Sequence, residues 1–319
     1  MKCWRSMGWT ALSLNDLTFG AFRIIITSVM KRSSALILLG ALLLLAGCGD
    51  RSSVSSIYGI PDWTKDGKIA CIRGITQERF DSMGTVISKS YTEWLTYMDA
   101  DGGNAYSDID ITADNASNLI MSSVATLAAY ASGVGDGSFN KAVIYYFPSA
   151  SGSHATRLEI ALSNAVSFDW DNTGTKLVYC NTAGEIRTIS IDGTGDTLLT
   201  DVDATSVAWK NGNRIAFTYL DSGVSKVSLI NSDGTNRLNT NVSWVSGLCV
   251  SKANTFEVYG VKGTTYVMID TQALTEATKI ASFSGNNPHL ALTGDKIVFD
   301  KDNSLYTQDF SGAAAVKIK

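Results

Sequence analysis

Short apolar segments separated by glycine-containing turns recur along most of this chain. The clearest copy covers residues 205–238, in which an apolar strand ends at Trp209 and a Gly/Asn turn leads into the strand 215–217. A third strand follows over 226–230, and an Asp-Gly turn precedes a brief fourth strand. Continuously apolar strands are typical of sheets that are buried on both faces. Gly-Asn and Asp-Gly pairs supply the positive φ angles of tight hairpins. The pattern therefore predicts a repeated unit of four antiparallel strands.

Weaker copies of this unit extend from residue 57 to residue 319. One apolar residue serves as a marker in each copy: Ile69, Leu119, Leu177, Ile215, Phe256 and Ile297. The last four markers recur about every 40 residues, a period typical of β-propellers. The longer first intervals indicate insertions. Six copies predict six four-stranded blades. Since no blade can bury both of its faces alone, we expect residues 54–58 to pair with the last copy and close the ring.

Residues 60–70 read Ile-Pro-Asp-Trp-Thr-Lys-Asp-Gly-Lys-Ile-Ala. This resembles the repeat of TolB-like propellers, roughly Pro-x-Trp-Ser-Pro-Asp-Gly before an Ile-Ala-Phe strand. Trp209 with residues 215–217 matches that repeat again, and residues 233–235 resemble its third turn. The resemblance covers residues 57–319, is poor in the second copy, and implies an all-β, six-bladed β-propeller with four-stranded antiparallel blades. TolB also has an N-terminal α/β domain. Only about ten residues separate Cys48 from the first blade, so the partners of that domain are not carried over.

The N-terminal region reads as a bacterial export signal. Residues 30–47 combine a charged start, a short apolar run and small residues, and the run is too short to span a bilayer. Residues 45–48, Leu-Ala-Gly-Cys, resemble the bacterial lipobox, which implies cleavage between Gly47 and Cys48 and acylation of Cys48. Several acyl chains on one residue anchor a protein stably. The alternatives are an ordinary signal peptide that contains a Cys and a buried apolar helix.

Two neighbouring segments complete the domain assignment. Residues 1–29 are interpreted as an upstream extension from a start codon assigned too early, with Met30 as the true start. Residues 48–56 are predicted to be a lipidated tether, followed by the propeller at 57–319.

Composition and motifs narrow the range of functions. The net charge of −4 and the pI near 5.2 disfavour a nucleic-acid partner, which usually requires a basic surface. Residues 99–104 resemble the start of an EF-hand loop but lack its distal Glu, so they are read as a turn. With only two histidines and no Gly-x-Ser-x-Gly motif, we predict no metal, cofactor or catalytic residue.

Three cysteines of the propeller are predicted to be buried thiols, although one disulfide remains an alternative. They are Cys71, Cys180 and Cys249.

Antiparallel strands place the second-to-third loops and the blade-to-blade connections on one face of a propeller. Both long insertions, 74–90 and 130–140, belong to that face, which we call the connection face. Function concentrates on such loops. We therefore predict that the connection face binds a partner. The candidate contacts are Arg73, Arg79, Phe80 and Asp81.

The leading hypothesis is a non-enzymatic, lipid-anchored protein of the bacterial envelope (outer membrane, periplasmic or surface-facing) that binds a protein partner. The alternatives are a glycan-binding or glycan-cleaving propeller and a purely structural surface lipoprotein. Exposed Trp and Tyr side chains or clustered carboxylates at the pore mouth would favour the glycan alternative.

Overall fold

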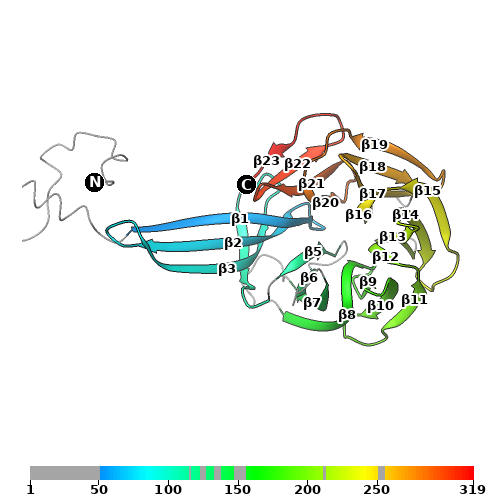
Figure 1. Ribbon diagram of the computed structural model, residues 1–319, viewed down its shortest axis with the longest axis horizontal. Coiled ribbons are helices and arrows are strands. Elements are labelled where there is room, and N and C mark those ends of the chain that lie inside the picture. Colours follow the sequence, from blue (N-terminus) through cyan, green and yellow to red (C-terminus); the bar gives the residue numbers. More distant parts are fainter. Residues whose placement is uncertain are drawn as a thin grey trace, which may run out of the picture. The chain divides into compact units, whose positions relative to one another are not determined.

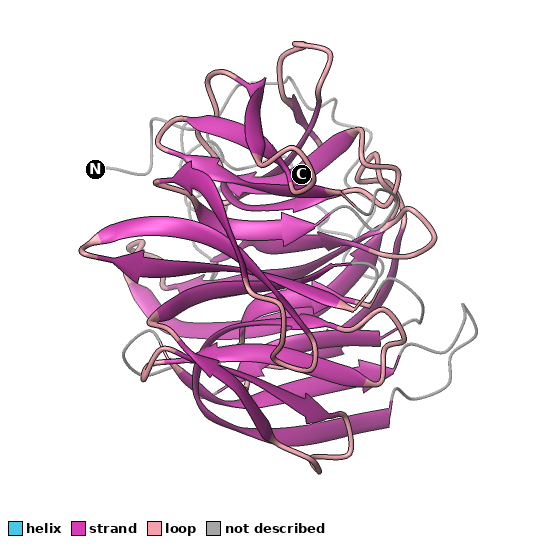
Figure 2. Cartoon of the chain, turned by 90° about the vertical axis from the view of Figure 1, so that its right-hand side faces the viewer, coloured by secondary structure: helices cyan, strands magenta, loops and turns pink. Residues whose placement is uncertain are grey.

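The computed structural model describes residues 51–114, 116–122, 127–132, 138–146, 156–210, 213–250 and 256–319. The predicted extension, signal peptide and lipobox, including Gly47 and Cys48, lie outside these residues. The described residues form strands, turns and loops and no helix (Figures 1 and 2). Accordingly, no described helix is long and apolar enough to cross a membrane. Residues 52–79 and 86–319 form one compact unit.

Four sheets in this unit contain four strands each, in sequence order. The first comprises β1 (Arg51–Trp63), β2 (Ile69–Phe80), β3 (Val86–Met98) and β4 (Ala105–Asp110). Another comprises β12 (Ala204–Lys210), β13 (Arg214–Asp221), β14 (Val224–Asn231) and β15 (Leu238–Ser243). The next comprises β16 (Ser246–Val250), β17 (Glu257–Lys262), β18 (Thr265–Asp270) and β19 (Thr275–Ile280). The last comprises β20 (Asn286–Leu290), β21 (Lys296–Lys301), β22 (Ser304–Asp309) and β23 (Val316–Lys317).

The remaining sheet has seven strands because one long strand is shared. Its strands are β5 (Ser117–Met121), β6 (Leu127–Ser132), β7 (Phe139–Tyr146), β8 (Thr156–Trp170), β9 (Lys176–Asn181), β10 (Glu185–Ser190) and β11 (Thr197–Asp201). The first part of β8 pairs with β7 and the last part pairs with β9. The sheet therefore divides into two groups of four, β5–β8 and β8–β11.

In the second copy, the marker residue does not occupy the position that it has in the other copies. Leu119 lies in β5, the first strand of its group, whereas Ile69, Leu177, Ile215 and Ile297 lie in second strands. Residues 109 and 110, which precede this copy, end β4 of the first sheet. The expected insertion 130–140 includes the end of β6 and the start of β7, and residues 133–137 lie outside the described residues.

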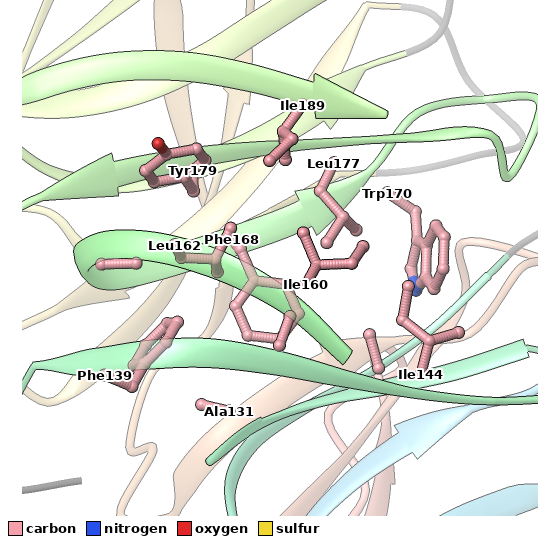
Figure 3. Packing of buried hydrophobic residues seen from close by; sticks show 13 residues of the cluster. Ala131, Phe139, Ile144, Ile160, Leu162, Phe168, Trp170, Leu177, Tyr179 and Ile189 are labelled. Atoms are coloured by element: carbon pink, nitrogen blue, oxygen red, sulfur yellow. The ribbon is translucent and has the colours of Figure 1, made fainter. Parts of the chain in front are cut away.

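Apolar side chains fill the space between neighbouring groups of four strands, as the continuously apolar strands predicted. Figure 3 shows one such cluster, in which Phe139 and Phe168 meet edge to face with ring centres 5.5 Å apart. The buried Trp170 at the end of β8 donates its indole N–H to the carbonyl of Ile120 in β5, at 3.1 Å. Packing therefore joins the two groups that share β8.

The first and last sheets pack together and close the ring. Trp63 and Met98 of the first sheet share a cluster with Val298 and Leu305 of the last. The expected pairing of residues 54–58 with the last copy was wrong, because these residues continue β1, whose neighbour is β2. Tyr58 nevertheless donates its N–H to the carbonyl of Asn303 in the last sheet at 3.1 Å, and Ile60 of the same strand donates its N–H to the carboxylate of Asp300 at 3.3 Å.

The expected insertion loop 74–90 is instead a continuation of strands β2 and β3, which are joined by a turn over residues 81–85. The predicted tether is also partly strand, because β1 begins at Arg51. Residues 52–58, 73–79 and 86–92 thus form a three-stranded extension of the first sheet, which we call the arm (Figure 1).

Candidate functional site

A pocket of about 270 Å³ lies where the inner strands β1, β5, β8, β12, β16 and β20 converge. Its lining includes the polar or ionisable residues Asn118, Asn287, Asp62, Asp169, Cys249 and His289. The inner strands come from every group of four strands. The pocket is therefore a product of ring closure.

Irregular backbone shapes this pocket. Asn118, Gly247 and Asn287 adopt φ values of 50°, 58° and 46°, and the pairing register shifts beside each of them. Asn and Gly tolerate this left-handed conformation. Ile60 adopts it as well, at 51°, although its branched side chain disfavours it. Such strain tends to cluster at functional sites.

Two buried carboxylates hold adjacent inner strands together. Asp62 accepts the N–H of the following residue at 2.7 Å and the N–H of Met121, in the next inner strand, at 2.6 Å. Asp169 repeats this arrangement, since it accepts the N–H of the following residue and the N–H of Trp209, both at 2.7 Å. Hydrogen bonds to a charged acceptor are among the stronger ones. Each carboxylate therefore fixes the spacing between neighbouring sheets.

His289 links the last inner strand to the first. Its Nδ1 lies 3.2 Å from a carboxylate oxygen of Asp62. Burial acts to lower the pKa of His289, but the carboxylates of Asp62, Asp169 and Asp300 outweigh this effect and raise it. The imidazole therefore binds a proton more readily than a free histidine does. It then forms an ion pair between β20 and β1.

Sequence reasoning missed these three residues, although the sequence carried a signal. Asp62 and Asp169 each precede a Trp at the same position of the repeat, and His289 occupies that position in the last copy. A polar residue that recurs inside an otherwise apolar inner strand marks a shared structural requirement.

Cys249 also lines the pocket, with its Sγ 2.9 Å from the hydroxyl of Tyr266. Burial raises the pKa of this thiol to about 12. A nucleophilic cysteine needs a depressed pKa, so Cys249 is not activated. Cys71 and Cys180 are buried, and none of the three described cysteines is part of a disulfide. No group of three or more His, Cys, Asp or Glu residues suited to a metal ion occurs among the described residues.

Hydrogen bonds identify the connection face. Trp244, between β15 and β16, donates its N–H to the carbonyl of Ser225 in the β13–β14 hairpin, at 2.6 Å. Phe283, between β19 and β20, does the same with Thr264 of the β17–β18 turn, at 2.7 Å. Sheet-to-sheet connections and second-to-third hairpins therefore share one face, as the strand order predicted. Inner strands begin at this face, so pocket residues near their starts, such as Asn287, lie toward it.

Trp244 is the prominent side chain of the connection face. Its exposed fraction is 61%, and its φ is 65°, which is unusual for a bulky residue. The hydrogen bond to Ser225 holds this backbone in place. The fold thus presents a large aromatic side chain to solvent.

The four residues predicted as contacts do not gather at one point. Arg73 donates to Ser56 Oγ at 3.3 Å and stacks over the ring of Tyr58. Arg79 and Phe80 are consecutive residues of β2, so their side chains point to opposite faces of the strand.

Asp81 belongs to the turn, where its carboxylate accepts the N–H groups of Met83 and Thr85 at 2.9 and 2.8 Å. The EF-hand-like segment is likewise a turn, in which Asp101 accepts the N–H of Gly103 at 2.8 Å.

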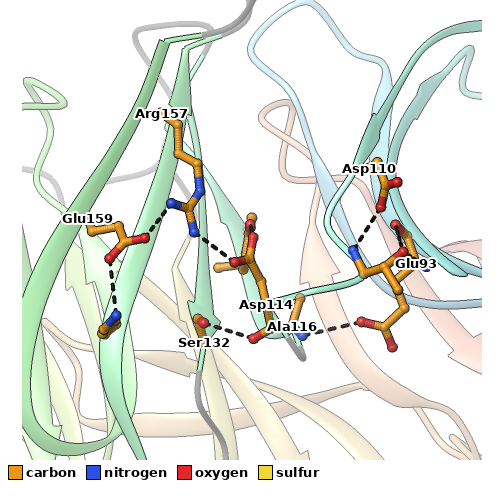
Figure 4. Close-up of polar contacts among 10 residues, drawn as sticks. Glu93, Asp110, Asp114, Ala116, Ser132, Arg157 and Glu159 are labelled. Carbon is orange, nitrogen blue, oxygen red and sulfur yellow. Dashed lines mark hydrogen bonds and ion pairs between the residues drawn. The ribbon is translucent and has the colours of Figure 1, made fainter.

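A charged cluster between β4 and β8 also proves to be a structural junction (Figure 4). Arg157 donates to Asp114 at 2.7 Å and also pairs with Glu159, which contacts Lys141 at 3.1 Å. Burial acts to lower the pKa of Arg157, but Asp114 and Glu159 outweigh it and raise the pKa. These charges neutralise one another at the link between the first two groups of strands.

No protein-family model matches the chain, and no curated protein matches it. Among solved structures, TolB from Acinetobacter baumannii is similar with a TM-score of 0.53 at 11% identity, over 85% of this chain and 80% of that chain. A nidogen/laminin complex is similar with a TM-score of 0.51 at 13% identity, over 81% of this chain and 90% of that chain. At these identities the likeness shows the fold alone. The described chain is a β-propeller, so the resemblance to TolB-like propellers is confirmed at the level of the fold.

Proposed function

We propose that this chain is a lipid-anchored protein of the bacterial envelope whose six-bladed propeller binds a protein partner and catalyses no reaction. The anchor is Cys48, which ends the lipobox-like sequence after residues 30–47. The pairing of β8 with both β7 and β9 supports a count of six, in which β8 is the last strand of one blade and the first strand of the next.

One observation carries the binding role, namely the exposure of Trp244 on the connection face. Trp is enriched among the residues that dominate the energy of protein interfaces. A side chain of this size loses apolar contact with water when a partner covers it. The constrained backbone of Trp244 reduces the entropy lost on binding. Pocket residues near the starts of the inner strands, such as Asn287, add polar groups toward the same face.

The polar groups at the axis support a structural rather than a catalytic role. The carboxylates of Asp62 and Asp169 are occupied by backbone N–H donors from two strands each. The thiol of Cys249 has a raised pKa. These groups hold the ring together and leave its faces for recognition.

Glycan binding is the second candidate, because an exposed indole such as that of Trp244 is also a surface on which a sugar ring stacks. The two candidates differ in the class of ligand that Trp244 contacts, a protein in the first and a glycan in the second. A purely structural lipoprotein would retain neither class of ligand.

The test uses the tagged, lipidated full chain crosslinked in its native host, compared with Trp244→Ala and Leu198→Ala. Leu198 is a matched control, because it is also an exposed apolar residue but lies in the outermost strand β11. We expect Trp244→Ala to weaken partner binding by about 30-fold, a loss typical of an interface hot spot. The control should bind as the wild type does. Equal binding by both variants would contradict this face as the interface. Retention on cell-wall polysaccharide without a protein partner would favour the glycan candidate.

A further inference from the structure

The arm concentrates exposed apolar side chains. Of the twelve large apolar side chains that are exposed in the described chain, five lie in the arm and one in the turn that joins β2 to β3. The five in the arm are Val54, Ile57, Val86, Ile87 and Tyr91. A concentration of exposed apolar side chains usually marks a surface that binds another protein or a membrane.

Cross-strand contacts keep the arm ordered as a sheet. The Tyr91 hydroxyl and Ile57 lie so close over Gly74 that a Cβ there would meet them at 2.6 and 2.9 Å. Lys89 of β3 forms an ion pair with Glu78 of β2, at 2.9 Å. The seven residues 52–58 of β1 span about 20 Å at the usual rise of a strand. The arm is therefore built as a spacer.

Chain connectivity relates one end of this spacer to the anchor. Arg51, the first residue of β1, follows Cys48 by three residues. Each residue extends the chain by at most about 3.5 Å, so Arg51 lies within about 11 Å of Cys48 and Val54 within about 21 Å. The acyl chains begin at the cysteine itself. The start of β1 is therefore held near the membrane surface whenever Cys48 is acylated.

The exposed side chains lie at the same end of the arm. Since β1, β2 and β3 are consecutive and adjacent, β1 and β3 run in the same direction and start at the same end. Val54 lies near the start of β1, and Val86 and Ile87 are the first two residues of β3. Apolar side chains on a surface held at a bilayer are stabilised by insertion at the boundary between headgroups and acyl chains.

We propose that the end of the arm carrying Val54, Val86 and Ile87 enters the headgroup region of the membrane in which Cys48 is anchored. The arm then holds the propeller at a set distance from the bilayer. This inference rests on the lipid anchor proposed above. The occupant of the apolar surface is the phospholipid bilayer.

The experiment places a polarity-sensitive fluorophore on the lipidated full chain in vesicles of phosphatidylethanolamine and phosphatidylglycerol that contain a nitroxide-bearing lipid. The label is attached through Val54→Cys, and the matched control is Ala277→Cys on the exposed outer strand β19. Cys71 and Cys180 are fully buried, and burial raises the pKa of the Cys249 thiol to about 12, so these thiols do not compete for the label.

We expect the label at position 54 to shift to shorter emission wavelength and to be quenched by the nitroxide lipid, while the label at position 277 does neither. Adding Val86→Asp to the labelled Val54→Cys chain should reduce the quenching. A chain that floats with vesicles but shows equal signals at both positions would overturn the arm's role and leave the anchor intact. A chain that does not float would overturn the anchor as well. Disulfide-linked dimers of unlabelled Val54→Cys in vesicles would overturn the proposal in favour of arm-to-arm pairing.

Discussion

Replacing Asp62 by Asn tests whether the axial carboxylates hold the propeller closed. Asn retains the shape of the side chain but offers one acceptor oxygen in place of two. Of the N–H groups that Asp62 accepts, one belongs to Met121 in the next inner strand, at 2.6 Å. The substitution also removes the charge that pairs with His289 at 3.2 Å.

The expected loss follows from these contacts. A hydrogen bond to a charged group contributes about 1.5–3 kcal/mol, and a buried donor left without its acceptor costs about 1–3 kcal/mol. Asp62→Asn loses one such bond and weakens a second, so we expect the free energy of unfolding to fall by about 2–4 kcal/mol. Asp169→Asn affects the equivalent two hydrogen bonds from backbone N–H groups, so it should lower the free energy of unfolding by a similar amount. The loss should be smaller by the contribution of the ion pair with His289, which only Asp62 forms directly.

The ion pair itself can be isolated by a double-mutant cycle of Asp62→Asn and His289→Gln, measured by urea unfolding at pH 6. We expect a coupling of about 1–2 kcal/mol, because contacting charges are not additive. Matching values of the denaturant slope m would show that the unfolded states are comparable. A coupling below about 0.5 kcal/mol, which is the usual error for independent sites, would refute the link between β20 and β1.

Two further predictions concern closure of the ring. The folded state raises the pKa of His289 above its ordinary value of 6.5, so its contribution to stability is complete below that pH and is lost as pH rises through the folded-state value. The free energy of unfolding of the wild type, measured in urea, should therefore decline above pH 6.5, and His289→Gln should remove that decline. If the free energies of the wild type and the variant ran parallel with pH, that result would contradict the ion pair. Gly67 and Gly102 share a φ of 76°, but only at Gly102 would a Cβ meet backbone, lying 2.2 Å from the carbonyl oxygen of Ile318. Gly67→Ala should lower the free energy of unfolding by about 1 kcal/mol and Gly102→Ala by about 2–4 kcal/mol, measured by thermal or urea unfolding. Equal losses would argue against close contact between the first and last sheets.

The local parts of the fold could be predicted because they depend on neighbouring residues. Continuously apolar strands such as residues 215–217, followed by Asp-Gly or Gly-Asn turns, indicate a sheet buried on both faces whatever the rest of the chain does. The arm could not be predicted in the same way. Its strand 52–58 is mostly Ser and lies largely in solvent, so it lacks the apolar face by which strands are recognised and reads as a tether.

The sequence by itself determined the propeller repeat, the predicted export signal and the strand order that defines the connection face. Only the tertiary structure decided the axial site, because Asp62 contacts Met121, which lies 59 residues later in the chain, and His289 of the last copy contacts Asp62 of the first copy. Likewise, the exposure of Trp244 depends on which surfaces the neighbouring sheets leave uncovered. Short-range sequence patterns predict how a strand pairs with the next one. They do not predict which side chains come into contact when the first and last sheets close a ring, since those contacts arise only from the packing of all the sheets together.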